Sequence, residues 1–236
     1  LFVDSDDYID HDMIEKMYES IIAEKADIAV CDFIIEWQNV NKIFYQNINA
    51  NKTKAINSLL RMDTMPGLPN KLIRLSLIKD NNLLFHKDMN VGEDYMLMPK
   101  LFYYASKVIK VEKTFYHYIQ TNSSSYTKNF SIENIKSIIY ALDELTRFFE
   151  SKQDYNLYKY SILQGKLRKK IEIIFNSEPK YWNDLISIFP EINELKNYNF
   201  LSRREKNSYF FIRNNNYFGL AFYKKTYNSL FQIVQK

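Results

Sequence analysis

Cysteine, glycine, proline and histidine are all scarce in this chain of 236 residues, which contains one, four, five and three of them. The single cysteine, Cys31, excludes a disulfide within the chain and agrees with a reducing compartment. Because Cys31 lies in a mostly apolar run, we expect a buried, unreactive side chain rather than a nucleophile. No apolar run reaches the roughly 18 residues that a membrane-spanning helix needs.

Charge is unevenly distributed along the chain. Residues 1–130 carry 15 Lys and Arg against 17 Asp and Glu, whereas residues 131–236 carry 17 against 11. The basic half can favour peripheral contact with an anionic membrane surface or carrier lipid, although an ordinary solvated helical surface is the simpler interpretation. No nucleic-acid-binding motif accompanies this charge, so we expect no nucleic-acid partner.

The first half of the chain has the pattern of an α/β domain. A short apolar strand, 1–3, leads into an acidic turn, which is followed by a helix over about 11–25 and a buried strand over 27–33. Asp10 is placed to cap that helix. Its predicted buried face consists of Met13, Ile14, Met17, Tyr18, Ile21 and Ile22. Further on we expect strands over 39–48, 107–111 and 114–119, helices over 53–62 and 92–105, and a strand with a short helix over 71–84.

The pattern changes to long helical repeats of apolar residues after residue 130. We expect helices over 132–151, 157–176 and 182–188, and from 217 to near the end, with Ser131 as the cap of the first. The intervening segment 120–128, with three consecutive serines, is expected to be a loop. These observations predict two domains, 1–130 and 131–236, with the second entirely α-helical.

Three carboxylates, Asp4, Asp6 and Asp7, stand within four positions at the start of the chain. Clustered carboxylates repel one another, and their hard oxygen atoms suit Mg²⁺ or Mn²⁺. A calcium loop is a poorer match because the glycine and the distal glutamate of an EF-hand are absent. A solvated capping turn is the remaining interpretation of this segment alone.

A second acidic pair, Glu93 and Asp94, follows Gly92 at the start of a predicted helix. The helix dipole favours acidic residues at this position whatever their role. A carboxylate held beside a metal site can also take a proton from a hydroxyl group, as a general base does.

Five ordered segments together resemble the family-2 glycosyltransferases of the GT-A fold, in particular bacterial members that build surface polysaccharides. The segments are Phe2-Val3-Asp4-Ser5-Asp6-Asp7-Tyr8-Ile9, Asn70-Lys71-Leu72-Ile73-Arg74, Leu84-Phe85, Gly92-Glu93-Asp94-Tyr95, and Tyr116-His117-Tyr118 with the loop Ser123–Ser125. The resemblance implies a partial GT-A (nucleotide-diphospho-sugar transferase) domain, followed by an α-helical C-terminal domain. It also implies that the chain lacks the N-terminal nucleotide-binding half of the family.

The resemblance assigns a role to each acidic residue. Asp6 is expected to bind the metal, Asp4 to face the donor ribose or a metal-bound water, and Asp7 to support their turn. Asp94 is expected to act as the catalytic base, with Glu93 orienting it or contacting the acceptor.

Three further residues receive weaker assignments. Lys71 and Asn70 fall in a segment that lies near the acceptor in the family, although a surface lysine is equally plausible at position 71. His117 is a candidate third metal ligand, and simple packing between Tyr116 and Tyr118 is the alternative.

The implied function is inverting transfer of a sugar from a nucleotide-diphosphate donor, with UDP as the expected nucleotide. The acceptor would be a glycan or a lipid-linked glycan in surface polysaccharide synthesis, with Mg²⁺ or Mn²⁺ as the cofactor. We expect a cytoplasmic protein at the inner face of the membrane. The alternative is a non-catalytic, truncated remnant that binds an acceptor or a partner protein.

Overall fold

The computed structural model describes residues 1–84, 89, 91–120 and 131–234. Its regular elements are, in chain order, β1 (Tyr8–Ile9), α1 (Met13–Glu24), β2 (Ile28–Glu36), β3 (Asn41–Phe44), α2 (Lys52–Leu60), β4 (Lys71–Ile73), α3 (Leu75–Asp80), α4 (Glu93–Tyr104), β5 (Val108–Ile119), α5 (Ile132–Glu150), the 3₁₀ turn η2 (Tyr155–Leu157), α6 (Lys159–Asn176), the 3₁₀ turn η3 (Pro179–Tyr181), α7 (Trp182–Leu185), the 3₁₀ turn η4 (Pro190–Glu194), α8 (Arg203–Arg213) and α9 (Tyr217–Val234).

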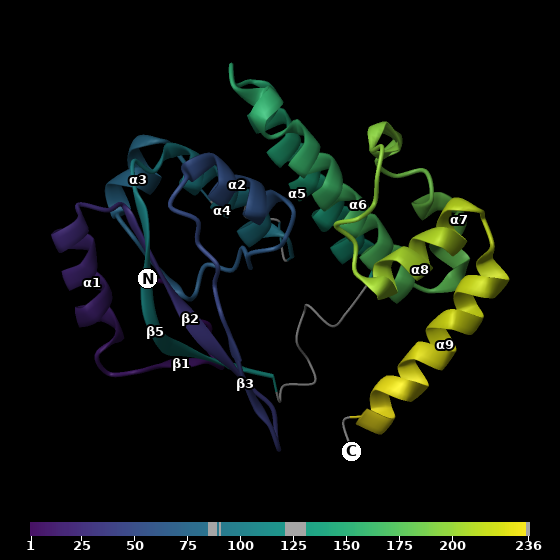
Figure 1. Ribbon diagram of the computed structural model, residues 1–236, viewed down its shortest axis with the longest axis horizontal. Helices are drawn as coiled ribbons and strands as arrows, with labels where there is room; N and C mark the ends of the chain where they lie inside the picture. Colours follow the sequence, from purple (N-terminus) through teal and green to yellow (C-terminus); the bar gives the residue numbers. More distant parts are fainter. Residues whose placement is uncertain (85–88, 90, 121–130, 235–236) are drawn as a thin grey trace.

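A mixed sheet occupies one end of the molecule and α7–α9 occupy the other, with α5 and α6 between them (Figure 1). Within the described residues the sheet has the order β1-β5-β2-β3, and β4 pairs with the same edge of β2 as β3 does. Among the strand pairs of the described residues, only β2 and β5 are parallel, and their connection runs through α2, α3 and α4. A parallel pair needs such a long crossover, which accounts for the helices above the sheet.

The two faces of the sheet contact different helices. Alternate residues of a strand point to opposite sides. Ala29, Cys31 and Phe33 of β2 therefore pack in one cluster with the buried face of α1. Ile28 and Val30 pack in a second, larger cluster with α2, α4, α5 and α6. Cys31 is fully buried, as expected, and burial raises the pKa of its thiol to about 11.

Two strand predictions need correction. Leu1–Val3 has no strand pairing, and the first strand is instead the two-residue β1, after the acidic turn. The expected strands over 107–111 and 114–119 are one strand, β5. The break between them is a β-bulge, because Cys31 pairs with Val111 and Asp32 pairs with Thr114, which leaves two residues of β5 without a partner on β2.

The predicted face of α1 is only half buried. Met13, Met17 and Ile21 are buried, and the other three residues of the expected face, Ile14, Tyr18 and Ile22, are 52–59% exposed. Six residues at this spacing span more of the helix circumference than contact with one sheet covers. The expected cap also differs, because Asp12 precedes the helix and makes no side-chain cap, while the Asp10 carboxylate contacts His117.

The helical half largely follows the predicted pattern. Ser131 caps α5 as expected, since its hydroxyl accepts a hydrogen bond from the Asn134 N–H at 3.2 Å. Helix α8 was not predicted. It begins with a capping box in which Ser202 and Glu205 bond reciprocally, and this sequence signature could have revealed it.

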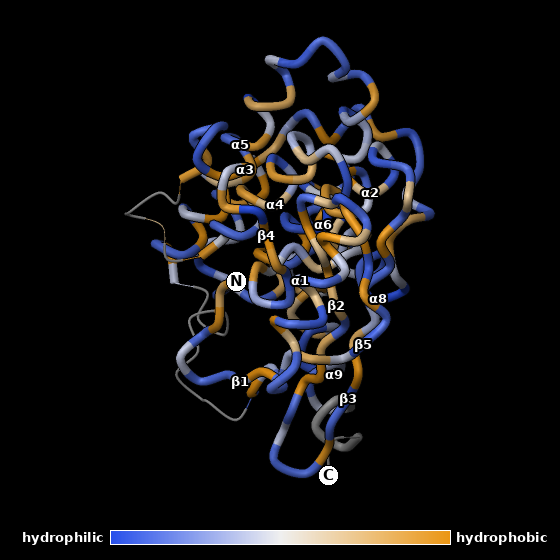
Figure 2. Tube along the Cα trace, turned by 90° about the vertical axis from the view of Figure 1, so that its left-hand side faces the viewer, coloured by the Kyte–Doolittle hydropathy of each residue, from blue (hydrophilic) through white to orange (hydrophobic). Residues whose placement is uncertain are grey.

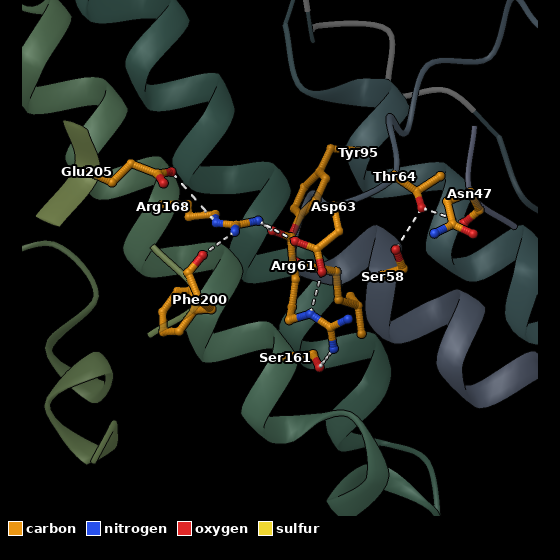
Figure 3. Close-up of polar contacts among 11 residues, drawn as sticks. Asn47, Ser58, Arg61, Asp63, Thr64, Tyr95, Ser161, Arg168, Phe200 and Glu205 are labelled. Carbon is orange, nitrogen blue, oxygen red and sulfur yellow. Dashed lines mark hydrogen bonds and ion pairs between the residues drawn. The ribbon is translucent and has the colours of Figure 1, made fainter. Parts of the chain in front are cut away.

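The two halves share one buried core and a polar junction. The larger hydrophobic cluster contains residues from both sides of position 130. At the junction, the Arg168 guanidinium of α6 donates to Asp63 Oδ1 at 2.7 Å and to the Phe200 carbonyl at 2.6 Å, and it faces Glu205 (Figure 3). The predicted boundary near 128–131 falls largely on residues outside those described, as do Phe85 and the loop Ser123–Ser125. The division into two domains stays a prediction.

Hydrophilic and hydrophobic residues alternate along the helices (Figure 2). This pattern is typical of amphipathic helices such as α5, whereas α6 is buried around most of its circumference. Within residues 1–84, 89, 91–120 and 131–234, no helix combines the length and the apolar character required to cross a membrane.

Candidate active site

The acidic segment forms a tight turn that is fastened to β5. The Asp7 N–H donates to the Asp4 carbonyl at 3.1 Å, and the Asp4 N–H donates to the Tyr116 hydroxyl at 3.3 Å. The Asp7 carboxylate accepts one bond from the Tyr116 hydroxyl and one from the Ile119 N–H. Both oxygens of Asp7 therefore hold the turn in place, while Asp4 and Asp6 lie at the surface.

The carboxylates of the turn oppose one another's ionisation. Partial burial, followed by the charges of Asp7 and Asp6, raises the pKa of Asp4. Burial also raises the pKa of Asp7, against the opposing effect of its hydrogen bonds to Tyr116 and Ile119. A bound cation would remove this penalty, because it favours the charged form of each carboxylate.

The residues present fit part of a divalent-cation site. In the described part of the chain, no group of three or more His, Cys, Asp or Glu side chains is arranged to hold a metal ion. Mg²⁺, however, is usually bound through one or two carboxylates together with waters and substrate phosphates. Asp4 and Asp6 match that minimal protein contribution.

Glu93 and Asp94 occupy the first turn of α4. Gly92 precedes them with a φ of 94°, a left-handed conformation that glycine adopts without strain. Asp94 Oδ2 accepts a hydrogen bond from the Leu68 N–H at 3.3 Å. Burial, and then the charge of Glu93, raise the pKa of Asp94 to about 7, although the Leu68 bond and Lys71 oppose the shift.

The second carboxylate of this pair has an unsatisfied atom. Glu93 Oε2 is buried and has no hydrogen-bond partner among the described residues. A buried polar atom without a partner is costly, so such an atom in a cavity is suited to receive a hydrogen bond from a ligand hydroxyl.

The buried side chain of Lys71 is hydrogen-bonded to the loop between α2 and β4. Its fully buried ammonium donates to the carbonyls of Met65 and Gly67 and to Asn70 Oδ1. Burial lowers the pKa of Lys71 to about 7, although the charge of Asp94 opposes the shift. Asn70 in turn donates to the Cys31 carbonyl at 2.5 Å. These bonds fix the loop against β2 and leave the lysine facing the protein.

The turn and the helix start meet in one cavity of about 390 Å³. Asp4, Asn70, Glu93 and Asp94, each a predicted site residue, line it together with aromatic and apolar side chains, among them Phe2, Phe33, Leu68, Tyr116 and Tyr118. A second cavity, of about 440 Å³, shares Met65, Gly67, Glu93 and Asp94 with the first. The second cavity extends towards α5 and α6, where Asn134, Lys169 and Glu172 line it.

His117 is not brought to the acidic turn. Its ring nitrogens contact Asp10 Oδ1 at 3.1 Å and Glu36 Oε1 at 2.6 Å, and its ring stacks on Tyr8 at 4.2 Å. Because Tyr116 and His117 are adjacent in β5, their side chains point to opposite faces, and only Tyr116 faces the turn. Both nitrogens of His117 are therefore engaged away from Asp4.

The sequence interpretation did not identify the role of the cavity's aromatic side chains. Tyr116 and Tyr118 belong to a segment that was singled out, but attention there fell on His117. The spacing of two residues along a strand is the signal that places both tyrosines on one face.

Comparisons with known proteins agree with the motif resemblance. No family model matches the chain. Poly(ribitol-phosphate) beta-N-acetylglucosaminyltransferase TarS of Staphylococcus aureus is 27% identical over 119 residues, which are 50% of this chain and 20% of TarS. Cholesterol galactosyltransferase of Borreliella burgdorferi is 28% identical over 224 residues, which are 84% of this chain and 62% of that protein.

Among solved structures, TarS 1–349 in complex with UDP-GlcNAc superposes with a TM-score of 0.66 at 14% identity, covering 97% of this chain and 67% of that one. The chain thus spans less than two thirds of the length of either curated relative. The structural likeness confirms the predicted fold class, an α/β GT-A-type domain with a helical C-terminal region.

Proposed function

Because the chain is related to glycosyltransferases and has part of their GT-A fold, we propose that it belongs to family 2. We propose further that it transfers a sugar with inversion of the anomeric configuration. The donor is a nucleoside-diphosphate sugar, and the acceptor is a hydroxyl of a glycan or lipid-linked glycan in surface polysaccharide synthesis. The observation that carries this proposal is the shared cavity, in which Asp4 and Asp94 come from segments some ninety residues apart. The UDP-GlcNAc in the TarS structure supports a UDP-linked donor.

The donor end of the cavity is the acidic turn. Asp4 and Asp6 would hold Mg²⁺ or Mn²⁺, and the ion would neutralise the charge of the departing diphosphate. Asp7 maintains the turn through Tyr116 and Ile119, so that the two outer carboxylates keep their positions. His117 takes no part in this assignment, because Asp10 and Glu36 occupy its ring nitrogens.

The acceptor end is Asp94. In one displacement, the acceptor oxygen forms a bond to the anomeric carbon, the bond to the diphosphate oxygen breaks, and its electron pair leaves with the diphosphate. The acceptor proton passes to the Asp94 carboxylate. A base with a pKa of about 7 is suited to this transfer near neutral pH, because about half of it is ionised there and the ionised form is more basic than an ordinary carboxylate. Glu93 raises that pKa and offers Oε2 to a substrate hydroxyl.

The residues of the neighbouring loop position this base. Leu68 donates its N–H to Asp94, and Lys71 fixes the same loop through the Gly67 and Met65 carbonyls. Asn70 lines the cavity, and its side chain supports the loop, because Oδ1 accepts from Lys71 and Nδ2 donates to the Cys31 carbonyl. We place the protein in the cytoplasm, at the inner face of the membrane, in agreement with the free, buried thiol of Cys31.

A donor screen tests this proposal. The purified full-length protein, with the nucleotide-binding half that this chain is expected to lack, is incubated with individual UDP-sugars, a glycan acceptor mixture and Mn²⁺, and released UDP is measured with and without EDTA. We expect acceptor-dependent release that EDTA abolishes and that Asp94→Asn lowers about a thousandfold. Asp80→Asn, which changes an exposed carboxylate at the end of α3, is the matched control and should keep full activity.

Binding measurements separate catalysis from simple recognition. Titration of UDP with Mn²⁺ should give a complex that Asp6→Ala weakens and Asp94→Asn leaves intact. UDP binding without turnover for any donor would instead support the alternative, a non-catalytic binding module. No UDP binding in the presence of Mn²⁺ would overturn the proposed donor site.

A further inference from the structure

Helix α9 lies at the end of the molecule opposite α1 (Figure 1), and aromatic side chains on its outward face are exposed to solvent. Phe218 and Phe222, one helical turn apart, are 86% and 65% exposed. Lys225 is exposed as well, and at 3.6 residues per turn it falls on the same face as Phe218. An exposed pair of phenylalanines is unusual on a helix whose other side is well packed.

The opposite face of α9 holds the helix against the rest of the protein. Leu220 is fully buried, and Tyr223 and Tyr227 contact the Phe175 ring of α6 at centroid distances of 6.3 and 5.9 Å. Lys224 donates to the Ser177 carbonyl at 3.1 Å. The helix is therefore anchored without help from Phe218 or Phe222, whose exposure needs a separate explanation.

The charges in the C-terminal segment that contains α8 and α9 are almost all positive. Residues 201–236 contain seven Lys and Arg but a single acidic residue, Glu205. Glu205 is engaged inward, with Arg168 and with the Ser202 cap. In the described part of this segment, no ion pair involves its exposed cations. Arg204 lies over the rings of Phe175 and Tyr227, and the others are Arg203, Lys206, Arg213 and Lys225. Their charge is available to an external partner.

Helix α1 has a second exposed apolar face, and it differs from the face of α9 in the sign of the surrounding charge. Ile14, Tyr18 and Ile22 of α1 are 52%, 59% and 54% exposed, comparable to the face of α9. The sequence of α1, however, contains three glutamates and one lysine. An anionic surface would repel α1 and attract α9, although the two faces expose similar amounts of apolar side chain.

We propose that the outward face of α9 docks on an anionic lipid bilayer. Phe218 and Phe222 enter the interfacial layer, and Lys225 and Arg213 lie at the level of the lipid phosphates. Aromatic residues combined with cations on one helix face are the features that hold a helix in the membrane interface. This inference does not depend on the proposed sugar transfer.

Vesicle sedimentation tests the inference. The protein is mixed with vesicles of phosphatidylcholine alone, or with about 30% phosphatidylglycerol, a fraction that gives a strongly negative surface potential. We expect binding to the anionic vesicles only, and loss of that binding in high salt. Phe218→Ser with Phe222→Ser should weaken binding about tenfold, and Arg213→Gln with Lys225→Gln should weaken it to a similar degree.

The matched control replaces the face of α1, as Tyr18→Ser with Ile22→Ser, and should bind as the unchanged protein does. All variants alter exposed side chains, and circular dichroism confirms that they are folded. Equal binding to both vesicle types, or equal loss in the control, would overturn the inference. Light scattering addresses a second copy as the occupant: a dimer that Phe218→Ser with Phe222→Ser dissociates would also overturn it.

Discussion

Asp94 carries a carboxyl group whose ionisation is opposed by its own burial and by the charge of Glu93. A base must be deprotonated to act, so the rate should fall as the pH drops below the pKa of about 7. Since Glu93 raises this pKa, its removal should lower it. The activity at acidic pH therefore depends on a residue that does not itself accept the proton.

Glu93→Gln should accordingly move the acidic limb of the pH–rate profile to lower pH. The amide keeps the shape of the side chain but not its charge, so the shift reports the electrostatic effect. The measurement is kcat/KM for UDP release between about pH 5 and 9, a range that brackets the expected midpoint. Glu172→Gln, on the far side of the second cavity, should leave the limb in place. An unmoved limb in Glu93→Gln would contradict the coupling.

Lys71→Met should destabilise the protein as well as reduce its activity. The change removes the ammonium that bonds Met65, Gly67 and Asn70, and buried carbonyls without partners are costly. We expect a loss of about 2 kcal/mol in the free energy of unfolding, measured by urea denaturation. Lys79→Met, at an exposed position of α3, should change it by less than about 0.5 kcal/mol. Lost activity with unchanged stability would instead favour direct contact between Lys71 and substrate.

At the scale of the residue, four of the predicted site residues line one cavity, whereas Asp6, Lys71 and His117 are not among its lining residues, and the roles of all of them stay predictions. Asp4, Asn70, Glu93 and Asp94 could be grouped because they stand in recognisable segments. The role of Asp7 depends on Tyr116, 109 positions away, and that of His117 on Glu36, 81 positions away. Such contacts follow from strand pairing and register, which a single sequence does not specify.

Secondary-structure elements were predicted where their periodicity was strong. Helices α4, α5 and α6 and the buried strand β2 begin and end within a few residues of the expected positions. The errors occurred where tertiary context decides. The apolar stripe of α1 exceeds the surface available to cover it, and the bulge in β5 looked like the end of a strand. Helix α8 was not predicted because its composition is polar, although the sequence contains its capping box.

Helices α2 and α6 approach closely at Gly165, a contact with no sequence signature. A Cβ atom there would lie 2.1 Å from the Leu60 carbonyl oxygen and 2.6 Å from the Tyr95 hydroxyl. The Leu60 carbonyl accepts a hydrogen bond from that same hydroxyl, so neither atom can move away without breaking this bond. Glycine is therefore required for packing here, not for backbone conformation.

Gly165→Ala should thus destabilise the protein, although alanine normally favours a helix by about 1 kcal/mol over glycine. We expect a loss of about 2 kcal/mol or more in the free energy of unfolding. The control is Gly67→Ala, where the nearest atom to the new methyl group is Pro69 Cδ at 3.6 Å, an ordinary contact. Equal stability of the two variants in urea would show that the helices can separate at little cost.

The molecule as a whole is held together across the predicted domain boundary. One hydrophobic cluster joins the inner face of β2 to α2, α4, α5 and α6, and continues to Leu220 of α9. The Arg168 junction adds polar contacts between the same halves (Figure 3). A shared core of this kind makes the two halves depend on each other for burial, whatever their evolutionary origin.

The two tryptophans allow this dependence to be measured, because each lies in a different half. Trp37 follows β2, and Trp182 is buried in α7, against Tyr217. In Trp182→Phe the fluorescence reports on the sheet, and in Trp37→Phe it reports on the helical half. Since both halves contribute to one core, we expect urea midpoints that coincide within each variant for fluorescence and circular dichroism. Two separate transitions would instead show that residues 1–130 and 131–236 fold independently, and the common core would then contribute little to either half.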